Sequence, residues 1–404
     1  MTHPVAIEMP STKPHWWSVF IAFLRLGLTS FGGPVAHLGY FQKEFVEKRK
    51  WLDATRYADL VALCQFLPGP ASSQMGIALG LSRAGISGAI AAFLGFTLPS
   101  AMAMCVFALM YDDLGNALGA GFLQGFKLVS VAVVAQALWS MGKNFSRGTI
   151  RTIITLISAI AVMMLPPTIG QILVIIVAGL VGIACLRTEN SSPIHAEDTN
   201  VSKRTAITAL ILFFVLLAGL PLLANTLQLY PVTLFDSFYR TGALVFGGGH
   251  VVLPLLESQA VQSGWVSQEA FLAGYGATQA MPGPLFTFAA FLGAISTQTP
   301  SGWIGASIAL LAIFLPAFLL VIGALPFWER WRHQQVLRNA LLGINAGVVG
   351  LLLAAFYHPV WTSAIHRPTD LLVAMAALML LIIAKLPAWL VVLLTVLFSG
   401  FFLS

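Results

Sequence analysis

Two Pro-Gly-Pro triplets carry the clearest chemical signal in the sequence. Pro68-Gly69-Pro70 follows Gln65, and Pro282-Gly283-Pro284 follows Gln279. A proline at the first position of a helix loses no hydrogen bond, so the last proline of each triplet is suited to begin a new helix. The first N–H groups of a helix have no partner within it and carry partial positive charge, which makes them a binding site for an anion. Hydroxyl groups that follow the prolines can add donors, at Ser72, Ser73 and Thr287.

Basic residues inside apolar segments are a second candidate for anion chemistry. Arg25 and Arg240 each precede a triplet. An arginine in the middle of a membrane helix costs about 2.5 to 3.5 kcal/mol, so it usually faces a cavity, where its guanidinium can hold an oxyanion with two hydrogen bonds. The alternative is that the side chains reach back to the interface. Lys127 has no cationic counterpart, because the aligned region holds Asn345, and it is either a site residue or a helix-end anchor.

Glycine blocks lie between each arginine and its triplet. Gly32-Gly33 stands in one and Gly247-Gly248 in the other. Glycines allow close approach of the backbone and leave N–H groups free to face a ligand. Without a βαβ context they do not indicate a dinucleotide site. His250 follows the second block and is a further candidate ligand, although a single histidine beside a helix break is more often a packing residue.

These motifs occur in the same order twice, so the chain is a duplication. Arg25 and the first glycine block match their partners at an offset of 215 residues, and the first triplet matches the second at 214. The prolines alone could be read as kinks in packed helices. Two matched breaks, each with a glutamine, favour a functional site.

Composition places these motifs in a membrane. The 404 residues are 58% hydrophobic and 9% charged, whereas soluble chains are about 25% charged. We assign the net charge of +6 to cytoplasmic loops instead of to nucleic-acid binding. Almost all carboxylates fall in loops, and the three cysteines form no cluster. Neither a metal site nor another cofactor is therefore expected, and a cation transporter is disfavoured.

The hydropathy pattern predicts an all-α polytopic membrane protein. The expected organisation is an N-terminal repeat at 1–186, a hydrophilic linker at 187–204, an additional span at 205–224 and a C-terminal repeat at 225–404. Breaks at membrane depth are tolerated only where protein or a water-filled cavity satisfies the backbone. We therefore expect re-entrant hairpins or half-helices, at 16–36, 57–82, 234–254 and 268–299.

Loop charges predict that the two halves are inverted repeats. Residues 43–56 are basic, whereas 251–270 in the second half contain no lysine or arginine. The next loop is acidic in the first half, at Asp112 and Asp113, but basic in the second, at 330–338. Because basic loops stay in the cytoplasm, corresponding loops lie on opposite sides of the membrane. The two half-helix ends then approach the midplane from opposite faces.

The ordered motifs resemble the chromate ion transporter family in its long two-domain form. The resemblance rests on the segment from Arg25 to Pro34, the stretch before Trp51, the first triplet with Ser72 and Ser73, and the second glycine and triplet blocks. It implies a multi-pass protein of the bacterial inner membrane that exports chromate, a sulfate analogue, and so confers resistance. Residues carried over from the family signatures are Arg25, Gly32, Gly33, Pro34, Pro68, Gly69, Pro70, Arg240, Gly247, Gly248, Pro282, Gly283 and Pro284.

The second half departs from the first half of this pattern at two places. Gly249 stands in place of Pro34, and Leu285-Phe286 stand in place of Ala71-Ser72. We therefore expect two unequal half-sites in a secondary transporter, with no nucleotide-binding motif and possible assembly as a homodimer. The alternatives are a carrier of sulfate or another oxyanion, a passive anion channel and, last, a membrane-embedded enzyme, for which the sequence offers no buried carboxylate or histidine pair.

Overall fold

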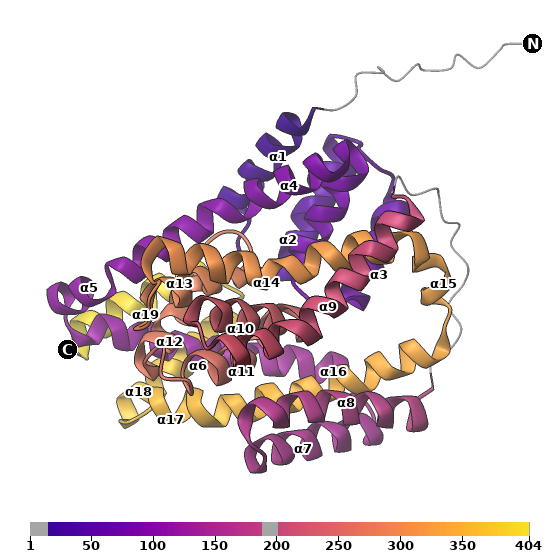
Figure 1. The fold of residues 1–404 in the computed structure, drawn as a ribbon. Helices are drawn as coiled ribbons and strands as arrows, with labels where there is room; N and C mark the ends of the chain where they lie inside the picture. The colour runs from indigo at the N-terminus through magenta and orange to yellow at the C-terminus, as the bar shows by residue number, and fades with distance from the viewer. Residues whose placement is uncertain (1–14, 188–200, 404) are drawn as a thin grey trace, which may run out of the picture.

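The computed structural model describes residues 15–187 and 201–403, which form helices and their connections and contain no strand (Figure 1). The first half contains α1 (Trp16–Thr29), α2 (Gly33–Phe41), the π-helix η1 (Gln42–Lys48), α3 (Ala54–Phe66), α4 (Ala71–Leu109), α5 (Tyr111–Leu118), α6 (Ala120–Phe145), α7 (Thr149–Met164) and α8 (Pro167–Cys185). Helix α9 (Lys203–Leu227) lies between the halves and contains the expected additional span. The second half contains α10 (Tyr230–Leu244), η2 (Gly249–Val251), α11 (Val252–Ala260), α12 (Gln268–Thr278), η3 (Leu285–Thr287), α13 (Phe288–Ile295), α14 (Gly302–Ala324), η4 (Leu325–Phe327), α15 (Trp328–Arg332), α16 (Gln335–Ala355), η5 (Phe356–Trp361), α17 (Thr362–Ala364), α18 (Pro368–Ile382) and α19 (Ala388–Phe402).

Several of the described helices are long and apolar enough to cross a membrane. Five meet that criterion within the described ranges, at 71–109, 120–145, 203–227, 302–332 and 335–364. Large apolar side chains cover the outside of the molecule, as expected for a surface that faces lipid. The all-α, multi-pass architecture expected from the hydropathy pattern is confirmed.

The two halves interlock through their last helices. The pair α7 and α8 packs on α16 of the second half, and they lie side by side at one edge of the molecule (Figure 1). In the matching arrangement, α18 and α19 pack on α6 of the first half. Each half therefore completes the core of the other.

Each Pro-Gly-Pro triplet begins a half-helix that folds back on the following span. Helix α4 is bent at Ala84 and Gly85, where the dihedral angles are not helical. Gly80 and Gly88 then touch so closely that a Cβ on either would overlap the backbone of the other, and Gly293 and Gly305 repeat this contact between α13 and α14. Residues eight apart in a straight helix would be about 12 Å apart, so the chain reverses here.

This reversal places the start of each half-helix near the middle of a span. At 1.5 Å per residue, 71–83 is about 20 Å long, whereas the span 86–109 is about 36 Å long. The half-helix packs against the span from the bend onward. Its N-terminus therefore lies roughly halfway along the length of the span. The second triplet agrees, because Gly283 lies against Phe96 and Ser100 in the middle of the span 86–109.

The two triplet loops make reciprocal contacts with the opposite half. The Gly69 N–H donates to the Val245 carbonyl at 2.7 Å, and the Gly283 N–H donates to the Ser30 carbonyl at 2.9 Å. These four residues are matched by the duplication, so the contacts require an approximate two-fold relation between the halves. Pro34 packs against Gly249, its own counterpart, with its Cγ atom 3.4 Å from the position of a Cβ on that glycine. The two-fold axis therefore passes near this pair.

Two sequence expectations differ from the structure or fall outside it. The acidic loop between spans is in fact the short helix α5, whose first turn holds Asp112 and Asp113. Carboxylates in a first turn stabilise a helix because they attract the partial positive charge at its N-terminus. This attraction favours a helix here over the expected loop. Of the expected linker, residues 188–200 lie outside the described residues.

An ion pair joins the halves and predicts a stability effect. The Asp59 carboxylate on α3 accepts a hydrogen bond from the Arg332 guanidinium on α15, and their side chains are 15% and 10% exposed. Removing one partner of a buried pair costs about 3 to 5 kcal/mol when the other charge is left uncompensated, and the cost is smaller here because Glu329 also lies 3.6 Å from Arg332 Nη1. We expect Asp59→Ala to lower the midpoint of thermal unfolding of the detergent-purified protein. The reversed pair, Asp59→Arg with Arg332→Asp, should recover much of that loss, and a reversed pair no more stable than the single variant would show that the contact is not stabilising.

Candidate anion site

A cavity of about 200 Å³ lies between the halves, at the break after α1 and at the second triplet. One water occupies about 30 Å³ in the liquid, so the cavity has room for a small hydrated anion. It is lined by Gly32, Gly33, Pro34, Val133, Gln136, His250, Thr278, Gln279, Met281, Gly283, Leu285, Leu381, Leu386, Pro387 and Ala388.

Helix N-termini bring partial positive charge to the wall of this cavity. Among the described helices, three begin at its wall: α2 after Gly32, the half-helix that starts at Leu285, and α19 after Pro387. None of the three has a side-chain cap. Pro34 has no N–H, and the N–H groups of Thr287 and Leu390 already donate to the Pro284 and Pro387 carbonyls, at 3.1 and 3.0 Å. The N–H groups of Gly33, Leu285 and Ala388 have no partner within their helices and present partial positive charge.

No carboxylate occurs among the described residues of the lining. Helices α12 and α18 also end at this wall, at Thr278 and beside Leu381, and their C-termini carry partial negative charge. The lining therefore offers N–H donors and no formal negative charge.

Polar side chains add donors to the same wall. His250 Nδ1 lies 2.7 Å from the Tyr275 hydroxyl, which fixes the orientation of the ring. When the hydroxyl donates to Nδ1, the proton of the neutral imidazole is on Nε2, which can then donate elsewhere. The Gln279 amide nitrogen lies 3.5 Å from the Tyr275 carbonyl, so one tyrosine positions both side chains. Gln136 on α6 also lines the cavity.

The structure gathers five of the predicted site residues at this cavity: Gly32, Gly33, His250, Gln279 and Gly283. Pro282 and Pro284 flank Gly283 and hold the loop that presents it. These residues come from three separate stretches of sequence. The contact between the Gly283 N–H and the Ser30 carbonyl is what brings the second triplet to the first glycine block.

The first triplet lies outside this cavity and is closed by a side chain. The Gln74 amide donates to the Pro68 carbonyl at 2.7 Å, and Gly69 is held by the Val245 carbonyl. Ser72 and Ser73 are buried beside Pro70, and Gln65 is exposed on the other side of the loop. The two triplets are thus unequal, but the more accessible one is the second, the reverse of what the polarity of their first turns predicts.

Three other predicted residues also lie away from the cavity. Gly247 packs on α16, with the Asn345 amide oxygen 3.4 Å from the position of a Cβ on it, and Gly248 leads into η2. Thr287 is fully buried, and its hydroxyl donates to the Pro284 carbonyl at 2.8 Å. Its proton is therefore already used within the first turn.

None of the basic candidates lines the cavity. Arg240 forms a two-pronged ion pair with Asp236, at 3.0 Å from Nε and 2.6 Å from Nη2. Asp236 occupies the fork that an oxyanion would need, which argues against the sequence interpretation of Arg240 as an anion ligand. Arg25 lies on the exposed side of α1. Lys127 is within electrostatic range of Glu269 and Asp370, and it also lies outside the lining.

The Arg240 pair predicts a structural role that can be separated from anion binding. The Asp236 side chain is only 3% exposed, so Arg240→Ala leaves a buried carboxylate unpaired and should destabilise the protein by about 3 to 5 kcal/mol. We expect Asp236→Asn together with Arg240→Gln to restore most of the stability, and transport with it. The thermal unfolding midpoint and the transport rate are measured for each variant. A stable double variant that does not transport would instead assign Arg240 a direct role.

Sequence reasoning missed two components of the cavity. Gln136 lies in the middle of an ordinary span and carries no local signal. The N-terminus of α19 is different, because Pro387 precedes the apolar run as Pro70 and Pro284 do. The rule that identified the triplets therefore also applies to Pro387, but its place at the cavity depends on the packing of α19 on α6.

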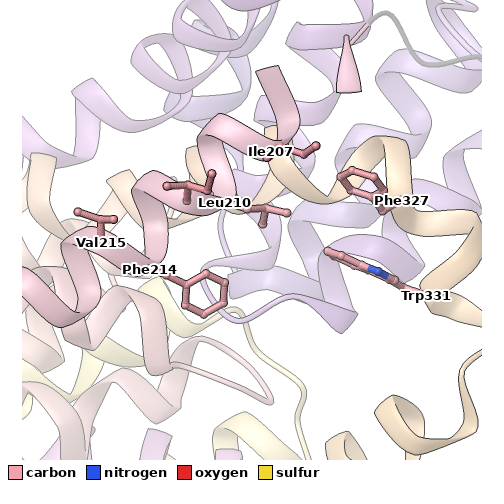
Figure 2. Close-up of a pocket in the computed structure, with 7 residues that line it drawn as sticks. Ile207, Leu210, Phe214, Val215, Phe327 and Trp331 are labelled. Atoms are coloured by element: carbon pink, nitrogen blue, oxygen red, sulfur yellow. The ribbon is translucent and has the colours of Figure 1, made fainter. Parts of the chain in front are cut away.

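A second hollow of the molecule is apolar. Figure 2 shows Ile207, Leu210, Phe214 and Val215 of α9 facing Phe327 and Trp331 near the end of α14. The Trp331 indole supplies the one polar group among these described side chains. Such a surface suits hydrocarbon and offers nothing to balance the charge of an oxyanion.

Comparisons with known proteins agree with this architecture. A model of the chromate transporter family matches residues 17–183 and 232–401, one segment in each half. A chromate transport protein of Pseudomonas aeruginosa is 30% identical over 86% of this chain and 81% of its own. An uncharacterised transporter of Methanocaldococcus jannaschii is 28% identical over 85% of this chain and 84% of its own, and a chromate transport protein of Cupriavidus metallidurans is 26% identical over 90% and 87%.

No solved structure matches the chain significantly. The family match covers most of both repeats, and the relatives align over most of their own length. On this evidence, the chain belongs to the chromate transporter family.

Proposed function

We propose that the protein is a secondary transporter that exports chromate across the bacterial inner membrane and thereby confers resistance to it. The observation that carries the proposal is the meeting of uncapped helix N-termini at a cavity without a carboxylate. N–H groups from several helix starts at one cavity suit a tetrahedral oxyanion, which accepts hydrogen bonds on all its oxygens. The two relatives named as chromate transport proteins support chromate as that anion.

The repeat supplies a means of alternating access. Two matched halves related by an approximate two-fold axis can swap conformations around a fixed site. The swap converts an inward-facing state into an outward-facing one. The loop charges favour an axis in the membrane plane, as inverted repeats require. The Gly69–Val245 and Gly283–Ser30 contacts are equivalent positions at which the two states would differ, because each joins one half to the other.

The direction of transport follows from the membrane potential. The interior of a bacterial cell is negative, so the potential drives anions outward and opposes their uptake. The sequence has no nucleotide-binding motif, and export therefore draws on ion gradients or on the potential itself. Sulfate shares the charge and shape of chromate and is the second candidate substrate of this site.

Uptake of radiolabelled chromate into everted membrane vesicles tests the proposal. In such vesicles, export appears as uptake, and we expect it to be saturable, dependent on energisation and reduced by excess sulfate. A passive channel would instead give flux that rises in proportion to concentration and shows no acceleration by chromate preloaded on the opposite side. Vesicles that accumulate sulfate but not chromate would overturn the assigned substrate.

A further inference from the structure

A third hollow, which has polar walls, lies between α1 and the following segment formed by α2 and η1. Its volume is about 520 Å³, and its polar wall consists of Arg25, Thr29, Tyr40, Lys43, Glu44 and Lys48. We call it the basic crevice. Arg25 and Thr29 on α1 are four residues apart, as are Glu44 and Lys48 on η1, so each helix turns one face to the crevice. A π-helical segment such as η1 is rare, and such segments are frequent at functional sites.

Positive charge in the basic crevice exceeds what its one carboxylate neutralises. Among the described residues, Arg25 and Lys43 form no ion pair. Glu44 is already paired, at 2.7 Å from Arg49 Nε and 3.5 Å from Lys48 Nζ. The arginine that satisfies Glu44 does not line the crevice. The crevice therefore retains a net positive field.

The second half of the duplication has no equivalent of this charge. Its counterpart of Arg25 is Arg240, which is paired with Asp236, and residues 251–270 hold no lysine or arginine. The basic crevice thus belongs to one face of the protein, and the positive-inside rule makes that face cytoplasmic.

The basic crevice and the cavity are neighbours. Thr29 lines the crevice and Gly32 lines the cavity, and three residues of chain span at most about 11 Å. Helix α2 begins at the cavity, and Tyr40 near its other end lines the crevice. An anion leaving the crevice past Thr29 would next meet the N-terminus of α2.

We propose that the basic crevice is a second anion-binding site, which captures a tetrahedral oxyanion from the cytoplasm and delivers it to the cavity. A lipid phosphate group has the same chemistry and is the other source of such an anion. The delivery step rests on the proposed export function, whereas binding in the crevice does not.

Cysteine reactivity measures the field without any transport assay. Thr29→Cys is placed in a Cys185→Ser background, because Cys185 is exposed while Cys64 and Cys105 are buried. Clefts lined by one sign of charge raise the local concentration of counter-ions by about tenfold or more. A negatively charged methanethiosulfonate should therefore react about tenfold faster than a positively charged one, and inorganic sulfate should slow it. Lys43→Gln with Lys48→Gln should bring the two rates together.

Lys50→Gln is the matched control, since Lys50 is exposed in the same basic stretch but does not line the crevice. It should leave the ratio of rates unchanged. Equal rates in the parent protein without protection by sulfate would overturn the proposal, whether or not chromate is transported. Repeating the assay in phosphatidylcholine with and without phosphatidylglycerol identifies the source. Sulfate protection in both lipids supports capture from the cytoplasm, whereas protection lost with phosphatidylglycerol overturns capture and assigns the crevice to lipid.

Discussion

Gln279→Glu is expected to reduce chromate transport at least about a hundredfold, while the same substitution at the matched position, Gln65→Glu, has little effect. Gln279 lines the cavity, whereas Gln65 is exposed outside it. The substitution preserves size and replaces an amide by a carboxylate. Two unit charges 4 Å apart repel by about 4 kcal/mol at an effective dielectric constant of about 20, and a dianion is repelled more strongly. A hundredfold loss corresponds to about 2.7 kcal/mol, well within that repulsion.

Initial rates of chromate uptake by everted vesicles, corrected for the amount of inserted protein, provide the measurement. Gln136→Glu should behave as Gln279→Glu does, because it also places a carboxylate in the wall. Equal activity of Gln279→Glu and Gln65→Glu would show that the anion does not pass the second triplet.

Gly283→Ala is expected to lower transport about tenfold or more, with a smaller loss for the matched substitution Gly69→Ala. Both glycines have positive φ, +96° and +123°, where an alanine costs roughly 1 to 2 kcal/mol. At Gly283 the new Cβ would lie 2.8 Å from Ser100 Oγ and 3.0 Å from the Phe96 carbonyl oxygen, which is backbone and cannot turn away. The loop must shift, and its hydrogen bond to the Ser30 carbonyl is then lost.

At Gly69 the first obstacle is the end of the Gln74 side chain, also at 2.8 Å, which can move at the cost of its hydrogen bond to the Pro68 carbonyl and without displacing backbone. Both variants share the strain of an alanine at positive φ. The difference in transport between them therefore reports the displacement of the backbone at Gly283. Transport rates are measured beside the thermal unfolding midpoint of each purified variant. A greater loss of transport in Gly69→Ala at equal stability would place the working site at the first triplet instead.

The sequence was sufficient to predict the parts of the fold that repeat. Two triplets at a constant spacing identified the half-helices at 71–83 and 285–295, because proline and glycine act locally on the backbone. The duplication also led to the expectation of a site built by both halves. The cavity agrees with that expectation, since it joins Gly32 of the first half to Gly283 of the second.

The partners of individual side chains could not be predicted in this way. Arg25 and Arg240 are equivalent in sequence, but Asp236, one helical turn before Arg240, has Ile21 as its counterpart. That single difference pairs one arginine and leaves the other facing the basic crevice. An ion pair between residues four apart is a recognisable pattern, and it could have been weighed against anion binding.

Which triplet opens on the cavity depends on contacts between distant residues. Gln74 covers the first triplet, whereas its counterpart in the second half is Phe288, which has no amide to close the loop. The polar first turn of 71–83 is therefore less accessible than the apolar one that begins at Leu285. The N-terminus of α19 likewise reaches the cavity only because α19 packs on α6 of the opposite half.

The position of a bound oxyanion can be found in crystals of the protein soaked with selenate, whose selenium scatters anomalously. We expect an anomalous peak in the cavity, within hydrogen-bond distance of the first N–H groups of α2, of the half-helix at Leu285 or of α19. A peak at the basic crevice as well is compatible with this expectation. Selenate bound at the first triplet near Ala71, or in the crevice alone, would contradict the assignment of the cavity as the substrate site.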